Sequence, residues 1–540
     1  MQFGLLLVNY FILELTLKKS ENIKTTTVKL ATKSPELPYF MPMLEHMAKV
    51  DDINEVIKAR IVKSCELLDA GVPLYPNGFE KPLFLSRLLD NEDISPEELE
   101  KLEPMTSAGR IMSMRSFGKV TFFHLQDQTG QLQCYASRED LGEEAYSLFK
   151  KFNIGDIVGV CGKLFKTNTG ELTLNCLKIT LLTRAIRPLP EKYHGLKDVE
   201  IRYRQRYVDM IVSERTRDIF RKRSLIVREF RHFMEEEGFL EVETPMLHPI
   251  AGGAAAKPFV THHAALDMEL YMRIAPELYL KRILVGGFDK VFELNRNFRN
   301  EGISTQHNPE FTMCEFYWCY ATYKDLMDLT ERLFARIAKK VCGNTVITYQ
   351  GESIDLTPPW NKLSFYEALE TIGGHNPAFF MNYDELNAHL EKRGEKSLPG
   401  DPLGKLQAKL FDLDVEAKLV QPHFIYHYPT DISPLARRND ENPEITDRFE
   451  LFITGRELAN AFSELNDPMD QRGRLEAQVQ EKEAGEEETH NMDEDFLRAL
   501  EYGMPPAAGE GIGIDRLVML MTDSASIREV IMFPLLKAEQ

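Results

Sequence analysis

The sequence has little of what defines several protein classes. It holds only seven cysteines, an odd number, and no two are spaced C-x-x-C, which argues against a disulfide framework or a zinc knuckle. Its apolar run near the start, Phe3–Leu17, is interrupted by Asn9 and Glu14. A bilayer span takes about 20 apolar residues, so this run is too short. Composition therefore excludes membrane-spanning, fibrous and disulfide-rich classes, and scattered thiols fit a reducing cytoplasm.

A basic excess is also absent. The sequence has 65 lysines and arginines and 84 acids, a net charge of −19. This balance gives no indication of a protein that coats nucleic acid nonspecifically. A local basic face is still compatible with that balance. With 43% hydrophobic and 28% charged residues the chain is an ordinary globular one. At about 150 residues per domain, 540 residues predict two to four domains.

Residues 1–49 are predicted to be an extension of uncertain status. The apolar run has no basic segment before it, which disfavours a signal peptide. We expect instead that translation begins later, at Met41, Met43 or Met47.

Residues 50–185 are predicted to form one domain. The stretch from Val50 to Leu68 has apolar residues at helical spacing. Between Ser107 and Thr183 come about five short β-rich runs, with turns at Asp127–Gly130 and Asn168–Gly170. So many short strands in so few residues predict a small closed barrel.

Residues 186–200 read as a linker because they contain two prolines and a glycine. From residue 201 to 540, helices and strands mix without a regular βαβ alternation. That pattern favours an antiparallel sheet with flanking helices. The predicted fold class is therefore α+β, with an all-β barrel in front of the larger domain.

Three blocks carry most of the chemistry, and two of them are built on strands. In Gly238–Phe259, Pro245 follows an amphipathic helix and a short strand. A proline after a helix is common, so this block alone indicates little about function. In the second block Arg299 and Glu301 sit two apart, so on a strand both project from one face, and Glu315 and Tyr317 do the same. Charged and aromatic side chains on neighbouring strands suit a charged, flat ligand. For any one of them, an ordinary salt-bridged hairpin explains as much.

The third block is Gly509–Leu517. Its glycines at 509, 511 and 513 alternate, so a strand there would show a bare face on which a flat base could lie. Arg516 follows at the start of an apolar helical run. The spacing matches neither a Walker loop nor the dinucleotide glycine pattern.

These three blocks, in this order and behind a small barrel, resemble the three motifs of class II aminoacyl-tRNA synthetases. The similarity is closer to the lysyl-tRNA synthetases of the bacterial, class II type, and it runs from about Val50 to Leu536. The segments that carry it are RIAPELYLKR (Arg273–Arg282), FRNEGIS (Phe298–Ser304), HNPEFT (His307–Thr312) and RFELF…GRELANAFSELNDP (Arg448–Pro468).

The resemblance implies a lysine–tRNA ligase for translation. ATP and L-lysine would give lysyl-adenylate and pyrophosphate, and lysine would then pass to the 3′ end of tRNA(Lys). The substrate carboxylate is already a nucleophile, so positioning and charge neutralisation must supply catalysis. The catalytic residues implied are Arg299 and Arg516. A cytoplasmic homodimer is implied as well, joined through the block that ends near Pro245.

The resemblance also implies an ATP site. Arg299 would bridge the α-phosphate and the lysine carboxylate, since a guanidinium suits a bidentate contact. Phe311 and Arg516 would sandwich the adenine. The implied ATP-binding set is Arg299, Glu301, His307, Asn308, Phe311, Glu450, Gly513 and Arg516.

Glu450 and Glu457 are implied to hold Mg²⁺, which prefers hard oxygen ligands together with substrate phosphates. Their spacing of seven allows two turns of one helix face, or two strand positions across a turn. Without the resemblance, a pair of surface acids would be the better interpretation.

The implied lysine pocket is rich in acids, which select a cation over an anionic or neutral side chain. Glu277 and the backbone of Gly253 would take the α-amino group. Glu315, Tyr317 and Glu464 would take the ε-ammonium group. The implied lysine-binding set is Gly253, Glu277, Arg299, Glu315, Tyr317, Asn460 and Glu464.

The barrel resembles an anticodon-binding OB-fold, in which bases are read by stacking and edge hydrogen bonds. The matching positions are Arg115, Phe122, Gln133 and Glu171. For Phe122 alone, a place in the barrel core is an equal alternative.

Two positions depart from the family pattern, Gln306 and Lys257, where arginines are expected. One phosphate contact is therefore in doubt. An aspartyl- or asparaginyl-type enzyme is the nearest alternative, but it would leave the pocket acids unpaired. A catalytically inactive binding module is disfavoured by the intact Arg299 and Arg516. A ligase that lysylates a protein would lack the barrel.

Overall fold

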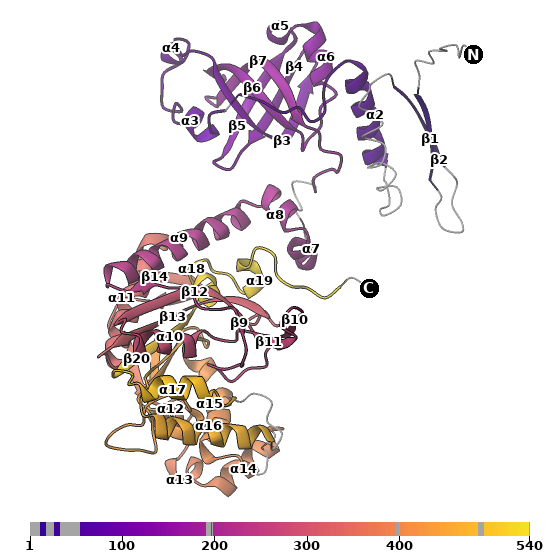
Figure 1. The fold of residues 1–540 in the computed structure, drawn as a ribbon. Coiled ribbons are helices and arrows are strands. Elements are labelled where there is room, and N and C mark those ends of the chain that lie inside the picture. Colours follow the sequence, from indigo (N-terminus) through magenta and orange to yellow (C-terminus); the bar gives the residue numbers. More distant parts are fainter. Residues whose placement is uncertain are drawn as a thin grey trace, which may run out of the picture. The chain divides into compact units, whose positions relative to one another are not determined.

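The computed structural model describes residues 55–80, 82–190, 196, 198–395, 397, 400–483 and 491–538, with the backbone alone for two earlier strands. The chain divides into two compact units, Met1–His194 and Gly195–Gln540 (Figure 1). Each unit is described by itself.

Before residue 55 the described backbone is one strand pair, β1 (Phe11–Leu17) and β2 (Thr26–Thr32), which run antiparallel. The predicted later translation start, at Met41, Met43 or Met47, lies outside the described residues. The helix α2 (Glu55–Asp69) follows and buries Ile57, Ile61, Leu67 and Leu68, as its apolar spacing predicts.

The first unit is built around a closed barrel of five strands in the order β3-β4-β5-β7-β6. Alternation creates its core: in β4 the side chains of Thr121, Phe123 and Leu125 are buried, and those of Phe122 and His124 are only partly so. The predicted barrel is confirmed. Its strands are β3 (Met105–Phe117), β4 (Val120–Gln126), β5 (Gln131–Ser137), β6 (Ile157–Lys166) and β7 (Leu172–Thr183), with short helices α3 (Leu85–Leu89), α4 (Pro96–Leu99), α5 (Arg138–Leu141) and α6 (Glu143–Phe149).

The second unit is organised by an eight-stranded sheet in the order β16-β17-β18-β19-β20-β13-β12-β8. All neighbours are antiparallel except β16 with β17 and β12 with β8, which confirms the predicted α+β class. The strands are β8 (Leu240–Glu241), β12 (Lys290–Phe298), β13 (Glu310–Cys319), β16 (Asn361–Ser364), β17 (His423–Tyr426), β18 (Arg448–Phe452), β19 (Glu457–Ser463) and β20 (Ala507–Gly513).

Helices cover the face of this sheet that holds the main hydrophobic core. The long helix α9 (Glu214–Glu236) packs beside α11 (Tyr323–Cys342), and both bury aromatic and aliphatic side chains such as Phe230 and Phe334. One carboxyl, Glu510 of β20, points into this core and is bonded by Thr330 Oγ1 at 2.8 Å, so burial holds its pKa well above the ordinary range.

The remaining helices come before and after α9 along the chain. They are α7 (Val199–Arg204), α8 (Arg206–Val212), α10 (Glu277–Val285), α12 (Phe365–Thr371), α13 (Pro377–Phe380), α14 (Tyr383–Lys392), α15 (Leu403–Asp414), α16 (Pro468–Glu483), α17 (Glu494–Glu501), α18 (Ile514–Met521) and α19 (Ile527–Val530), with short 3-10 turns η1 (Glu416–Lys418) and η2 (Thr430–Ile432).

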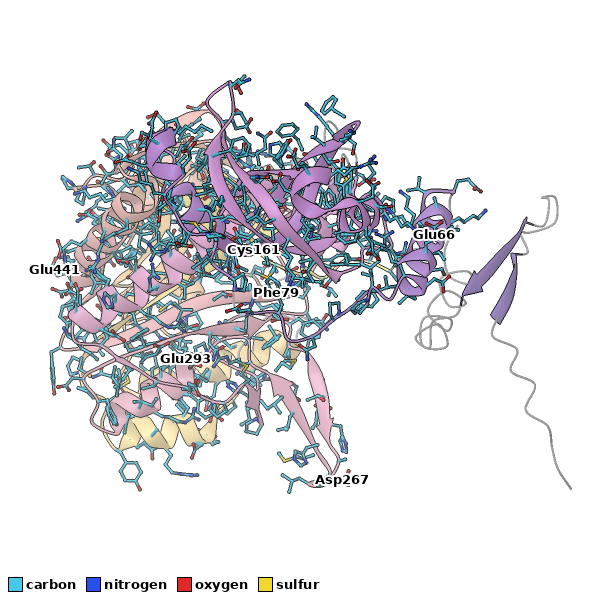
Figure 2. All side chains as sticks on the ribbon, turned by 90° about the horizontal axis from the view of Figure 1, so that it is seen from above. Glu66, Phe79, Cys161, Asp267, Glu293 and Glu441 are labelled. Carbon is cyan, nitrogen blue, oxygen red and sulfur yellow. The ribbon has the colours of Figure 1, made fainter. Side chains whose placement is uncertain are left out.

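Two small sheets complete the unit. One contains β9 (Leu247–His248), β10 (Val260–His263) and β11 (Met268–Met272), and the other pairs β14 (Val346–Tyr349) with β15 (Glu352–Asp355). Figure 2 shows Asp267 at the protruding tip of the β10–β11 hairpin. All seven cysteines are free thiols. Among the described residues, no helix is both long and apolar enough to cross a membrane.

Candidate active site

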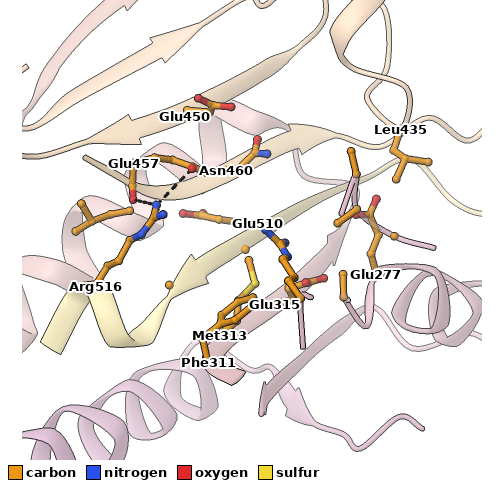
Figure 3. A pocket seen from close by; sticks show the side chains of 18 of the residues that line it. Glu277, Phe311, Met313, Glu315, Leu435, Glu450, Glu457, Asn460, Glu510 and Arg516 are labelled. Carbon is orange, nitrogen blue, oxygen red and sulfur yellow. Dashed lines mark hydrogen bonds and ion pairs between the residues drawn. The ribbon is translucent and has the colours of Figure 1, made fainter. Parts of the chain in front are cut away.

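A cavity of about 600 Å³ opens in the second unit, over the sheet strands β13, β18, β19 and β20. Every residue that the sequence predicts for the catalytic, ATP, lysine and metal sites lines this cavity, with the exception of Glu464. Figure 3 shows two different ends: Arg516 and Glu457 lie at one, and Glu277 lies at the other. After the ligands that the resemblance implies, we call them the phosphate end and the amino-acid end.

The amino-acid end is built from buried acids. Glu277 begins α10, and Glu315 and Tyr317 stand two apart on β13, so they share a face as predicted. Tyr317 Oη donates to Glu315 Oε2 at 3.3 Å. Burial, together with the nearby Glu277, raises the pKa of Glu315 to about 8. A carboxyl so far from water is stabilised as an anion by a nearby cation or by hydrogen-bond donors.

Glu464 lies just behind this wall. A Cβ added to Gly509 would be only 2.2 Å from its Oε1. Among the described residues that oxygen has no hydrogen-bond partner. Its Oε2 is 2.5 Å from Lys281 Nζ, and burial raises the pKa of Glu464 to about 8. The predicted pocket acid therefore lies behind the cavity wall, and one of its two oxygens is paired with Lys281.

At the phosphate end, Arg299 and Glu301 do not sit on a strand. β12 ends at Phe298, where it pairs with Glu310, so the prediction that both side chains project from one strand face is wrong. Arg299 instead enters the cavity from the loop after β12, with its guanidinium 5.2 Å from the ring centre of Phe311. Its buried Nε has no partner among the described residues, which leaves a donor for a ligand.

Arg516, on α18, is held by neighbours on two sides. Its Nη1 donates to the backbone oxygen of Glu457 and lies 3.4 Å from the Glu457 carboxylate. Its Nη2 lies 3.4 Å from His307 Nε2. Burial first, and then the charge of Arg516, lower the pKa of His307, so the imidazole is neutral before any anion binds.

Glu450 and Glu457 stand on β18 and β19, on opposite sides of a turn, so the strand alternative for their spacing is the correct one. Tyr428 Oη donates to Glu450 at 2.9 Å, and Arg448 pairs with the same carboxylate. Burial raises the pKa of Glu450 to about 7. Two carboxylates that line the same cavity are oxygen ligands of the kind that Mg²⁺ prefers.

Two asparagines and one glutamine complete the cavity wall. Asn308 is buried and donates to the backbone oxygen of Glu310 at 2.6 Å, while its Oδ1 has no partner among the described residues. Asn460 Oδ1 accepts from Arg448 Nε at 3.1 Å. Gln306 also lines the cavity, where the family pattern expects arginine.

The glycine strand β20 is not the open platform that its sequence predicts. Space beside Gly509 is filled by Glu464 and Tyr317, and space beside Gly511 by Met313, whose Cε would lie 2.4 Å from a Cβ there. Only Gly513 keeps an open side, facing the aliphatic part of Arg516 at 3.7 Å. The residues that fill the gap come from other strands, so the local pattern could not reveal them.

A second candidate surface lies on the barrel of the first unit. Phe122 and Tyr135 meet edge to face at 5.0 Å, and Tyr135 and Phe165 at 6.0 Å, which forms a partly exposed row of aromatic rings. Arg115 pairs with Phe122 across β3 and β4. Gln133 Nε2 donates to Thr173 Oγ1 at 2.9 Å, and Glu171 lies 3.7 Å from His124. The predicted anticodon residues thus gather on one side of the barrel.

Sequence reasoning missed three residues in these two places. Tyr135 and Phe165 extend the aromatic row, and Tyr135 could have been found because it alternates with Gln133 on one strand face. Lys281 could have been found from its position four residues after Glu277 on a helix.

Comparison with known proteins agrees with this geometry. The family model for "tRNA synthetases class II (D, K and N)" matches residues 198–537, and that for "OB-fold nucleic acid binding domain" matches residues 106–182. Proteins named lysine–tRNA ligase are similar over nearly their whole length. That of Pelotomaculum thermopropionicum is 54% identical over 92% of this chain and 98% of its own, and that of Bacillus cereus 51% over 91% and 99%. The resemblance to the lysyl enzymes is confirmed, and the chain belongs to the class II tRNA synthetases.

Proposed function

We propose that the protein is a lysine–tRNA ligase, which activates L-lysine with ATP and passes it to tRNA(Lys). The observation that carries the proposal is the single cavity with two unlike ends. Buried acids at one end suit a substrate with two ammonium groups, and arginines and carboxylates at the other suit a nucleotide. The two reactants would meet between them, at Arg299.

In the first step the lysine carboxylate attacks the α-phosphorus of ATP and pyrophosphate leaves. Arg299 would bind both the carboxylate and the α-phosphate, holding them in line and neutralising charge. Arg516 and His307 would contact the departing phosphates. Asn308 and Glu301 would hold the adenine edge. Glu450 and Glu457 would hold Mg²⁺, which when bound neutralises phosphate charge.

Lysine selection follows from charge. Glu277 would bind the α-ammonium group together with the backbone of Gly253, and Glu315, Tyr317, Asn460 and Glu464 would surround the side-chain ammonium. An aspartate or asparagine side chain would leave these buried acids without a cation, and such a mismatch reduces binding strongly. This argument disfavours the aspartyl and asparaginyl alternatives.

We also propose a homodimer in the cytoplasm. β8 is an edge strand of the large sheet, and Leu240, Leu247 and Ile250 in the block around Pro245 are each more than a third exposed. Leu240 lies on that edge strand and Leu247 on β9 of the small sheet, and exposed apolar side chains near an open sheet edge suit a partner surface. Light scattering of the purified protein tests this: a monomer mass at working concentration would contradict it.

Amino-acid-dependent ATP–pyrophosphate exchange tests the function. Each of the twenty amino acids is supplied in turn, with Mg²⁺ present, and we expect exchange with lysine alone. Exchange with aspartate or asparagine would instead identify the protein as an aspartyl- or asparaginyl-type enzyme. No exchange from a folded protein would point to the binding-module alternative.

The lysine KM is expected to fall as the pH rises from 6 to about 8. Glu315 and Glu464 have pKa values raised to about 8, so in the empty pocket they hold protons below that pH. Lysine needs the ionised carboxylates, so each proton that must leave weakens binding by up to about tenfold per pH unit. Calorimetry in buffers of different ionisation enthalpy should show proton release. A flat KM profile with no proton release would contradict this prediction.

Phe122→Ala is expected to lower kcat/KM for tRNA charging by roughly ten- to a hundredfold, because one base would lose its stacking partner. Lysine-dependent pyrophosphate exchange, which needs no tRNA, should stay at the wild-type rate. Phe117→Ala is the matched control, since Phe117 is 63% exposed on the same barrel but outside the aromatic row. Equal charging losses in both variants would remove Phe122 from the anticodon surface.

A further inference from the structure

Lys281 is a fully buried lysine that the proposed reaction leaves unused. Its side chain is 0% exposed on the second turn of α10. Its Nζ lies 2.7 Å from Glu277 Oε1 and 2.5 Å from Glu464 Oε2, with the rings of Phe462 and Phe496 centred 5.4 and 6.0 Å away. Burying an ammonium group is unfavourable unless it is well paired, so this cation depends on the two acids it bridges.

With all of its carboxylates ionised, the amino-acid end carries more negative than positive charge. Three buried carboxyls, Glu277, Glu315 and Glu464, lie at this end, and the ammonium of Lys281 pairs with two of them, Glu277 and Glu464, which leaves two negative charges when all are ionised. Of the nearby arginines, Arg273 pairs with Glu293 at 2.6 Å and Arg448 with Glu450, while the charge of Arg299, which acts on Glu315, would be matched by the carboxylate of the substrate. Two missing positive charges equal the two ammonium groups of a diamino acid.

The geometry points to Lys281 as a positioning residue for amino-acid selection. We propose that its ammonium ties Glu277 to Glu464 and so fixes the separation of the two carboxylates that receive the α- and ε-ammonium groups of lysine. It also sets the net charge of these four groups to −2 when the three carboxylates are ionised. The inference rests on the lysine site proposed above. Lys281 itself contacts no substrate atom, since it lies behind the cavity wall.

A purely structural role makes different predictions. Loss of a structural ion pair would lower the melting temperature and reduce activity without distinguishing between substrates. Loss of a positioning residue weakens lysine binding and leaves the ATP KM alone. It also acts through Glu464, so its effect should shrink once Glu464 has lost its charge.

The test is a double-mutant cycle in pyrophosphate exchange, with Lys281→Met and Glu464→Gln, singly and together. We expect Lys281→Met to raise the lysine KM roughly thirtyfold with the ATP KM unchanged. In the Glu464→Gln background we expect the further rise to be less than about threefold. Arg282→Met, which removes the neighbouring cation paired with Asp493 at 2.8 Å, is the matched control and should leave the lysine KM unchanged.

Several outcomes would overturn the proposal. They are an unchanged lysine KM in Lys281→Met, an equal rise in both backgrounds, or the same rise in Arg282→Met. If Lys281→Met does not fold, Lys281→Arg replaces it, because a bulkier cation keeps the charge but moves the two carboxylates; a wild-type lysine KM there would also overturn it. The wild-type reaction is measured first. No lysine-dependent exchange there would contradict the proposed function, whereas an active wild type with a normal variant would contradict only the role of Lys281.

Discussion

Arg299→Ala is expected to lower kcat for lysine-dependent pyrophosphate exchange by about three orders of magnitude. Losing a single preorganised donor to a developing charge costs about a hundred- to a thousandfold, and Arg299 would serve two oxygens at once. Its Nε is a buried donor with no partner in the described part of the chain, so the side chain is already placed for a ligand. Arg299→Lys should recover only a small part, because an ammonium cannot make the bidentate contact.

Arg296→Lys is the control for both variants. Arg296 stands on β12 three residues earlier, pairs with Glu310 at 3.6 Å and does not line the cavity. It should exchange pyrophosphate at the wild-type rate. If Arg299→Lys retained most of the activity, the bridging role would be wrong and simple charge would suffice.

Glu464→Gln is expected to raise the lysine KM by about a hundredfold while the ATP KM changes little. Removing one partner of a buried charge pair costs about 2–5 kcal/mol, which corresponds to this range. The substitution keeps the shape of the side chain, so the space beside Gly509 stays filled. Steady-state exchange with lysine and ATP varied separately gives both constants.

Glu310→Gln is the matched control, since Glu310 is an exposed acid on β13 and lies outside the cavity. A normal lysine KM in Glu464→Gln would mean that the ε-ammonium group is bound by Glu315 and Tyr317 without Glu464.

The sequence was a good guide to residues and a weaker guide to their geometry. The five-stranded barrel and the antiparallel sheet follow from alternation and turn residues, which act locally. The position of Arg299 does not follow from such local patterns, because the end of β12 is fixed by its pairing with β13 rather than by its own residues. Motif spacing still led to the correct side chains, since nearly all of them line one cavity.

Lys281 shows a different limit. It lies inside the segment Arg273–Arg282, but the predicted lysine pocket contains acids and not this cation four residues after Glu277. Its second partner, Glu464, is far away in the chain, so only the folded structure joins the three groups. A helical spacing could suggest the first contact, but no local pattern could suggest the second.

Gly509 has a consequence for protein engineering. Its missing side chain makes the room that Glu464 Oε1 and the Tyr317 ring occupy, so three positions from different parts of the chain share one small volume. A side chain at position 509 would collide with both of the others. A library meant to accept a different amino acid must therefore vary position 509 together with positions 317 and 464, because a single substitution at 509 leaves no room for them.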